Sequence, residues 1–242
     1  MNERRLSVTN SLIIINIVVF VAGILAQRPA VLGVSYPGGS PTSVFEVLGA
    51  YSWFSCFMQG ELWRVISYQF VHADFGHLLF NMWALYFFGP AVECVMGSKR
   101  YLAFYLVCGI SGALFSSFLS ALGLYAPGNS LLPACNELAA FAGYNGMVEV
   151  WQMIPLIGAS AALYGVMIAA AFLYPEARIS LLFPPITLKL RTFALSVVGI
   201  ASFIILFNLD NAGGEAGHLG GIIMGALIMY IGKLRREQKL PW

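Results

Sequence analysis

Four polar side chains have the types that a hydrolytic site needs. Ser160 can act as a nucleophile, and His218 can take its proton if the two side chains come within hydrogen-bond reach. His77 and Asn81 are four residues apart, so on a helix they share one face and can direct an imidazole N–H and an amide N–H at one point. Such donors stabilise the oxyanion that forms when a serine attacks a carbonyl. These residue types are those of a serine hydrolase.

Each of these residues also has a simpler interpretation. A serine in a membrane helix usually bonds to the carbonyl one turn before it, and a histidine or asparagine can simply join two helices. The combination is harder to explain in this way, because ionisable groups inside a bilayer are costly and mark sites or pathways. All three histidines, His72, His77 and His218, are expected at the same membrane face. We therefore expect a functional site here.

The composition places this site in a membrane. The chain has 242 residues, of which 59% are hydrophobic and only 10% are charged, and its mean hydropathy is +0.79. About a quarter of the residues of a soluble domain are charged, so an integral membrane protein is predicted. The net charge of +2 and the lack of a long Lys/Arg run argue against nucleic-acid binding. The four cysteines form no CxxC pattern and have no nearby His at zinc spacing, so no metal is expected.

Six apolar stretches are each close to the ~20 residues that a spanning helix needs. They cover residues 9–27, 75–96, 101–123, 157–174, 192–209 and 216–233. The first, preceded by Arg4 and Arg5, is interpreted as a retained helix and not as a signal peptide. All but two of the 13 Lys and Arg residues fall on one side of this topology, the exceptions being Arg28 and Arg64. The positive-inside rule therefore predicts cytoplasmic termini, with residues 1–8 as a cytoplasmic tail.

This topology brings the polar residues together. The segments 75–96, 157–174 and 216–233 all run from outside to inside, so their first turns meet at the outer face. At ~1.5 Å of rise per residue, Ser160, His218 and the pair on the first of these helices lie within roughly 10 Å of that face. Two long connections lie outside the membrane. Residues 28–74 are rich in aromatics and are expected to lie in the interface, and residues 124–156 are expected to form a broken outer-side insertion.

Small residues predict that the helices carrying Ser160 and His218 pack closely. Gly217, Gly221 and Gly225 recur every four residues on one segment, and Ala161, Gly165 and Ala169 do so on the other. Such stripes let two backbones approach and would bring the hydroxyl to the imidazole. Tyr164, one turn after Ser160, is expected either to stack on the ring of His218 or to be an ordinary core aromatic.

The ordered set of these residues resembles the rhomboid family of intramembrane serine proteases. The matching elements are Trp63-Arg64, His72, His77-x-x-x-Asn81, Gly158-Ala159-Ser160 with Tyr164, and Gly217-His218-x-x-Gly221. They follow the family's order and extend over about residues 50–230. No single motif is specific, but the ordered set on a matching topology is.

The resemblance implies an all-α, six-transmembrane-helix bundle with a long interfacial first outer loop, forming one domain over residues 1–242. In it Ser160 would be the nucleophile and His218 the general base and later acid. His77, Asn81 and the Ser160 N–H would form the oxyanion hole, with Gly158, Tyr164, Gly217 and Gly221 supporting the site. No cofactor or metal is implied. The partners would be transmembrane protein substrates in the lipid bilayer, cut near the outer face. The membrane would be a bacterial cytoplasmic membrane.

Three features depart from the family pattern or stay open. Ala161 stands where the family usually has glycine, which is harmless unless that position needs a positive φ. Glu215, three residues before His218, is expected to cap or complement the helix start, which leaves a Ser-His dyad. The resemblance also implies substrate entry near residues 192–214, where Phe203 and Phe207 are either gate residues or lipid-facing aromatics.

Two other function classes compete with an active protease. A catalytically inactive rhomboid-like protein that binds membrane proteins is favoured only by Ala161. A channel or transporter would need polar residues through the whole membrane, yet the inner halves of the three site helices are nearly bare of them except for Glu93. Glu93 is expected to pair with Lys99 or Arg100, or to cap local N–H groups. A disulfide between Cys56 and Cys135 stays open.

Overall fold

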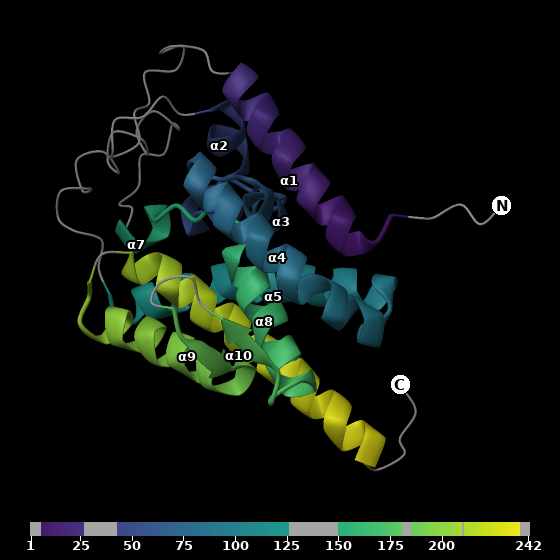
Figure 1. The fold of residues 1–242 in the computed structure, drawn as a ribbon. Helices are drawn as coiled ribbons and strands as arrows, with labels where there is room; N and C mark the ends of the chain where they lie inside the picture. Colours follow the sequence, from purple (N-terminus) through teal and green to yellow (C-terminus); the bar gives the residue numbers. More distant parts are fainter. Residues whose placement is uncertain (1–5, 27–42, 126–149, 181–184, 210, 238–242) are drawn as a thin grey trace.

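The computed structural model describes residues 6–26, 43–125, 150–180, 185–209 and 211–237, and most of them are helical (Figure 1). Within these ranges, four helices are long and apolar enough to cross a membrane. They are α1 (Val8–Leu25), α4 (Phe75–Met96), α5 (Ser98–Ala121) and α10 (Ala212–Glu237). Two further apolar helices, α8 (Ser160–Leu173) and α9 (Leu190–Leu206), are shorter. The apolar helices agree with the predicted helical membrane protein, and the count of six spans stays a prediction.

The expected helix boundaries agree with the structure for residues 75–96 and differ by a few residues for the other five stretches, and the difference matters most at α10. This helix begins at Ala212, not at residue 216. Asn211, with a φ of 66°, turns the chain into the helix, and its carbonyl accepts the N–H of Glu215 at 3.0 Å. His218 therefore lies in the second turn of α10 and not in the first. Glu215 lies inside the helix, one turn before it.

A small β ribbon lies between α8 and α9, so the all-α expectation needs a minor correction. Strands β1 (Arg178–Ser180) and β2 (Thr187–Lys189) pair antiparallel, with Ile179 opposite Leu188. Glu176 forms ion pairs with Lys189 and Arg191 beside the ribbon. This connection carries the cations that the sequence places between the two helices.

Helix α8 is the central element of the bundle. It has 14 residues, of which ten are buried, and it packs against α10, α5, α4 and α9. At ~1.5 Å per residue it is about 21 Å long, which is shorter than the ~30 Å hydrocarbon core. The chain before it, from Ile154 to Ala159, is not helical. The first residue of α8 can therefore sit below one membrane surface, reached by irregular backbone whose last two residues, Gly158 and Ala159, are buried in protein.

The described part of the first long connection packs onto the bundle. It forms α2 (Val44–Gly49), the π-helix η1 (Phe54–Met58), α3 (Arg64–Ser67) and the 3-10 helix η2 (Tyr68–Phe70). Tyr51, Cys56 and Tyr68 are buried against Ala113 of α5. Of the aromatics expected at the interface, Trp63 is exposed but Phe54 is buried, so an interfacial position can hold for only part of this segment.

Two parts of the predicted outer loops fall outside the described residues. These are residues 28–42 of the first loop and 126–149 of the insertion. Cys135, and with it the Cys56–Cys135 question, lies there too. At the edge of the insertion, helix α7 (Val150–Met153) precedes the non-helical approach to α8.

A buried carboxylate joins the start of α1 to the end of α4. Glu93 accepts hydrogen bonds from the N–H groups of Val8 and Thr9, from the Thr9 hydroxyl and from the Ser98 hydroxyl, at 2.7–2.9 Å. It thus caps N–H groups, as one of the two expectations had it, but on a helix that begins 85 residues earlier in the chain.

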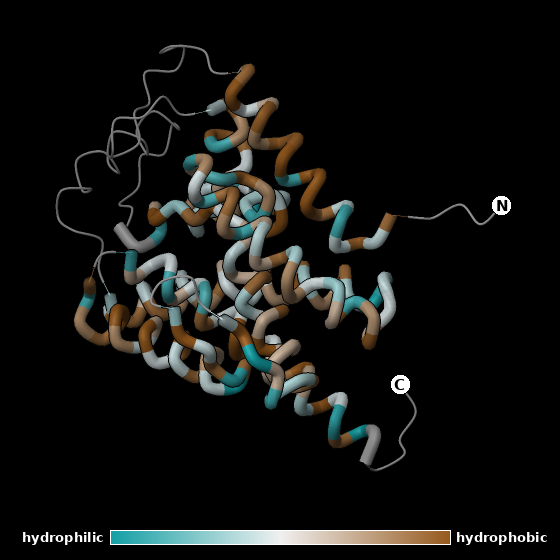
Figure 2. Tube along the Cα trace, viewed as in Figure 1, coloured by the Kyte–Doolittle hydropathy of each residue, from teal (hydrophilic) through white to brown (hydrophobic). Residues whose placement is uncertain are grey.

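The first turn of α1, the last turn of α4 and the last turns of α10 lie toward the same end of the bundle (Figure 1). Figure 2 shows α1 as a mostly hydrophobic helix, whereas hydrophilic residues gather in the last turns of α10.

Candidate active site

The candidate nucleophile lies at the first residue of α8. Leu156 pairs with Tyr51 through two backbone hydrogen bonds of 2.7 and 3.0 Å, and the Gly158 N–H donates to the Tyr68 carbonyl at 2.9 Å. These bonds tie the irregular chain before α8 to the segment that packs on α5. As the first helical residue, Ser160 has a backbone N–H with no carbonyl one turn earlier in the helix to accept it, and the helix dipole favours negative charge there.

The structure brings Ser160 and His218 into contact. The Ser160 Oγ lies 2.7 Å from His218 Nε2, across the interface between α8 and α10. The ring of Tyr164, one turn further along α8, stacks on the ring of His218 with centroids 4.1 Å apart and planes 10° apart. Of the two interpretations of Tyr164, the geometry therefore agrees with stacking on the ring of His218. The imidazole is held by a ring on its face and by a hydroxyl at Nε2.

This contact depends on small residues in three helices. A Cβ atom on Gly221 would collide with the backbone carbonyl of Ala161, and one on Gly225 would lie 2.8 Å from the Gly165 carbonyl. On α5, a Cβ atom on Gly112 would lie 2.5 Å from the Ala161 methyl and 2.7 Å from the Gly217 carbonyl. The predicted stripe between α8 and α10 is thus present, and α5 contributes a glycine that the sequence analysis missed.

The alanine at position 161 fits its surroundings. Ala161 is inside α8 and buried, and the described non-glycine residues with positive φ are Asn208 and Asn211. The condition under which Ala161 would disturb the site is therefore not met. The left-handed backbone belongs to Gly158 instead, which has a φ of 113°.

His77 and Asn81 converge on the chain just before Ser160. A Cβ atom on Gly158 would lie 2.6 Å from His77 Nε2 and 3.6 Å from Asn81 Nδ2. Asp74 caps α4 by accepting the His77 N–H at 2.9 Å, which fixes the turn that carries His77. The Asn81 amide nitrogen is buried and has no hydrogen-bond partner among the described residues. An amide donor without a partner beside the start of α8 is suited to an oxygen that carries negative charge.

His72 contacts His77 and takes no part in the Ser160–His218 contact. Its ring meets the His77 ring edge to face, with centroids 5.0 Å apart. Burial, with a smaller contribution from His77, lowers the pKa of His72 to about 3. The ring is therefore neutral near pH 7 and gives His77 an uncharged packing partner.

Glu215 reaches the other nitrogen of the imidazole. Its Oε2 lies 3.0 Å from His218 Nδ1, and the two side chains are only 14% and 13% exposed. Glu215 lies in the first turn of α10, as its expected role at the helix start requires, but it also contacts the histidine, which that expectation did not include. Because α10 begins four residues earlier than expected, Glu215 and His218 are one turn apart on one face of the helix.

The expected gate residues are placed but not assigned a role by the structure. Phe203 and Phe207 lie at the end of α9, with ring centroids 4.5 Å apart. Both are more than half exposed. Exposure fits a gate and a lipid-facing position equally, so the gate stays a prediction.

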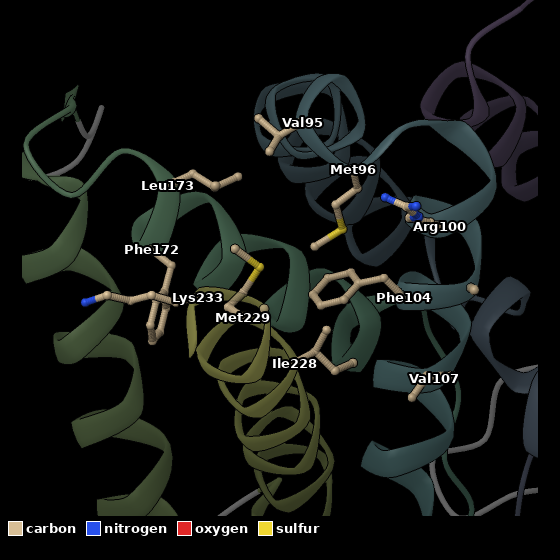
Figure 3. A pocket seen from close by; sticks show the side chains of 12 residues that line it. Val95, Met96, Arg100, Phe104, Val107, Phe172, Leu173, Ile228, Met229 and Lys233 are labelled. Carbon is tan, nitrogen blue, oxygen red and sulfur yellow. The ribbon is translucent and has the colours of Figure 1, made fainter. Parts of the chain in front are cut away.

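The bundle also has a cavity of about 580 Å³ far from these residues. It is lined by the last turns of α4, α8 and α10 and the first turns of α5, with Phe104, Met229 and Ile228 on its walls and Arg100 and Lys233 at its sides (Figure 3). The helices that carry the candidate site hold it in their first two turns, so the cavity lies toward their opposite ends. It contains none of the candidate site residues. Within the described residues, no three His, Cys, Asp or Glu side chains lie close enough to hold a metal.

Comparisons with known proteins give a consistent family. A family model described as a rhomboid domain matches residues 59–235. The chain is 30% identical to the mitochondrial Rhomboid protein 1 of Saccharomyces cerevisiae over 181 residues, which are 72% of this chain and 43% of that protein. It is 26% identical to the rhomboid protease AarA of Providencia stuartii over 92% of this chain and 71% of that protein. It is also 32% identical to the Inactive RHOMBOID-like protein 8 of Arabidopsis thaliana over 78 residues, 32% of this chain and 22% of that protein. The match thus spans less than half of the yeast protein.

Proposed function

Since the chain belongs to the rhomboid family, we propose that it is an intramembrane serine endopeptidase that hydrolyses peptide bonds of transmembrane proteins near the outer membrane face. The observation that carries this proposal is the 2.7 Å contact between Ser160 Oγ and His218 Nε2. A neutral imidazole at that distance can take the hydroxyl proton as the oxygen attacks a carbonyl carbon.

The reaction follows from the positions of these groups. Ser160 Oγ forms a bond to the scissile carbonyl carbon while its proton moves to His218 Nε2, which gives a tetrahedral oxyanion. His218 then passes that proton to the leaving amine as the peptide C–N bond breaks, which leaves an acyl-serine. A water molecule gives a proton to His218 and attacks the ester, and the returning proton restores the serine hydroxyl.

The oxyanion would lie among three donors. They are the Ser160 N–H at the start of α8, and the His77 ring and the Asn81 amide, both of which lie beside Gly158. Loss of one such donor costs about 10²–10³-fold in kcat in other serine hydrolases. The amide nitrogen of Asn81, which lacks a partner among the described residues, supports this role.

The proposed topology has six spans: α1, α4, α5, α8, α9 and α10. Both termini would be cytoplasmic, because the cations of the α4–α5 turn, the β ribbon and the end of α10 would then share that side. The site would open to the outer side, with Ser160 below the surface at the start of the short α8. Location in a bacterial cytoplasmic membrane stays a prediction, since the relatives come from bacteria, mitochondria and a plant.

A second candidate is an inactive rhomboid-like protein that binds membrane proteins. It is favoured by the similarity to an inactive plant relative over 78 residues. The Ser160–His218 contact argues for activity, because a binding protein has no need of it.

Cleavage of a reporter with one transmembrane segment tests the proposal. Wild-type protein reconstituted in lipid vesicles should cut the reporter, and Ser160→Ala should abolish cleavage without changing the fold, since it removes one oxygen and adds no bulk. Ser196→Ala on α9 is the matched control, because the hydrogen bond of the Ser196 hydroxyl among the described residues is to the Thr192 carbonyl one turn earlier. Folded wild-type protein that binds the reporter and leaves it intact would establish the inactive alternative.

A further inference from the structure

We propose that Glu215 is a positioning residue that holds His218 in the tautomer and orientation that Ser160 needs, so that the site works as a Ser-His-Glu triad. This inference rests on the proposed protease function. It starts from one contact, the 3.0 Å between Glu215 Oε2 and His218 Nδ1. The same ring contacts Ser160 through its other nitrogen at 2.7 Å.

The two ring nitrogens must differ for the serine to be activated. His218 can accept the Ser160 proton only if Nε2 carries no hydrogen, and a neutral imidazole then carries its hydrogen on Nδ1. A carboxylate oxygen beside Nδ1 accepts that hydrogen and favours this tautomer. The opposite tautomer would place a lone pair against the carboxylate oxygen and a hydrogen against the serine oxygen. Glu215 thus favours the reactive arrangement before any substrate binds.

The carboxylate also helps while the reaction proceeds. When Nε2 takes the serine proton, the ring becomes positively charged next to Glu215. An anion at 3.0 Å stabilises that charge, and it does so more strongly than in water, because both side chains are nearly enclosed. The proton stays on the imidazole and then passes to the leaving amine, so Glu215 changes no protonation state in this scheme.

The surroundings hold this geometry in place. Glu215 and His218 are three residues apart on α10, where side chains lie one above the other. Tyr164 from α8 stacks on the ring face at 4.1 Å and limits its rotation out of the plane. The contacts of Glu215 at Nδ1 and of Ser160 at Nε2 then oppose a flip of the ring about its Cβ–Cγ bond.

The simpler role of Glu215 is to complement the helix start. It lies in the first turn of α10, where a negative charge is favourable. That role, however, needs no contact with the imidazole, and the hydrogen bond found for this carboxylate among the described residues is the one to His218 Nδ1. The two roles differ in what they predict for Glu215→Gln. A helix-start role changes thermal stability, whereas a positioning role changes kcat.

The test compares Glu215→Gln with wild type in the reporter assay, with kcat and KM measured separately and normalised to folded protein. Gln has the same shape but no charge, and its amide can donate to Nδ1 and so favour the wrong tautomer. We expect kcat to fall by roughly 10²-fold or more, with KM within about twofold, because loss of the orienting carboxylate costs about 10⁴-fold in soluble serine proteases. The matched control is Glu176→Gln, which removes an acid of the exposed β-ribbon connection and should leave kcat unchanged. A fall in kcat of less than about tenfold, or an effect limited to KM or to thermal stability, would overturn the proposal.

A second measurement does not depend on turnover. The chain has three histidines, so ¹⁵N-histidine NMR of the protein in detergent gives three ring systems, and His218→Ala assigns the relevant one. The inference predicts that the neutral His218 ring carries its hydrogen on Nδ1 in wild type and shifts toward Nε2 in Glu215→Gln. An Nε2–H ring in wild type, or an unchanged tautomer in the variant, contradicts it. Because this readout needs no cleavage, it tests Glu215 even if the proposed protease function fails.

Discussion

Replacing Gly221 with alanine should separate Ser160 from His218 without changing either residue. Gly221 lies on α10 one turn after His218, against the backbone carbonyl of Ala161, which directly follows Ser160. A methyl group there would collide with that carbonyl, and backbone cannot move aside as a flexible side chain can. The two helices must therefore move apart by about 1 Å or more to restore van der Waals contact.

This movement sets the expected magnitude. A shift of about 1 Å would lengthen the 2.7 Å Ser160–His218 contact beyond hydrogen-bond range. Misplacement of this size can reduce kcat by about 10²-fold. Overpacking of a close interface also costs about 1–3 kcal/mol of unfolding free energy.

The assay compares reporter cleavage and thermal unfolding in Gly221→Ala and in Gly199→Ala. Gly199 lies on α9, and a Cβ atom there would meet open space. Gly199→Ala should therefore keep wild-type kcat and gain up to about 1 kcal/mol from helix propensity. If Gly221→Ala also kept its kcat within about twofold, close packing of α8 on α10 would not be what positions the serine and the histidine.

Three further substitutions test other parts of the site and fold. Gly158→Ala should lower the unfolding free energy by about 1–2 kcal/mol, because alanine is strained at the left-handed φ of 113°. The added methyl should also displace His77 and so lower kcat. Thermal unfolding and reporter cleavage measure the two effects, and an unchanged kcat would contradict this. Asn81→Ala should lower kcat by about 10²-fold or more with little change in KM, since it removes a proposed oxyanion donor; a KM effect alone would count against that role. Glu93→Gln should lower the unfolding free energy by about 1.5–3 kcal/mol by weakening the bonds to the start of α1, and should leave kcat unchanged well below the unfolding temperature; unaltered unfolding would refute this.

The parts of the site that follow from local patterns could be predicted. Spacing of four residues places His77 and Asn81 on one helix face, and the small-residue stripes predict the approach of Gly221 to Ala161. Both inferences need only helix periodicity and packing, which act over short stretches of sequence. The contact of Ser160 with His218 follows from them once the two helices are placed side by side.

The contact between Glu215 and His218 could not be read from the apolar pattern. Hydropathy places the start of the last helix after the polar and glycine-containing stretch, at residue 216, whereas hydrogen bonding extends the helix back to Ala212. With the later start, Glu215 lies outside the helix and is best explained as a cap. Boundaries of helices are where sequence patterns are least precise, and here four residues decide whether Glu215 and His218 share one face of a helix.

Polar contacts between segments far apart in the chain could not be predicted from the sequence either. Glu93 bonds to the first turn of α1, 84 and 85 residues away, and no periodicity links the two segments. The burial of Tyr51 and Tyr68 on α5 could not be predicted either. An aromatic-rich loop of the same composition can face lipid headgroups or a protein surface. Such contacts depend on the assembled bundle.

Covalent labelling of Ser160 by a fluorophosphonate probe tests the central claim most directly, because it reports the reactivity of this one hydroxyl and needs no known substrate. The proposed mechanism predicts that the folded wild-type protein is labelled at Ser160, and that labelling is lost in His218→Ala while thermal unfolding shows an intact fold. Folded wild-type protein that stays unlabelled, or labelling that persists at the same rate in His218→Ala, would contradict the mechanism.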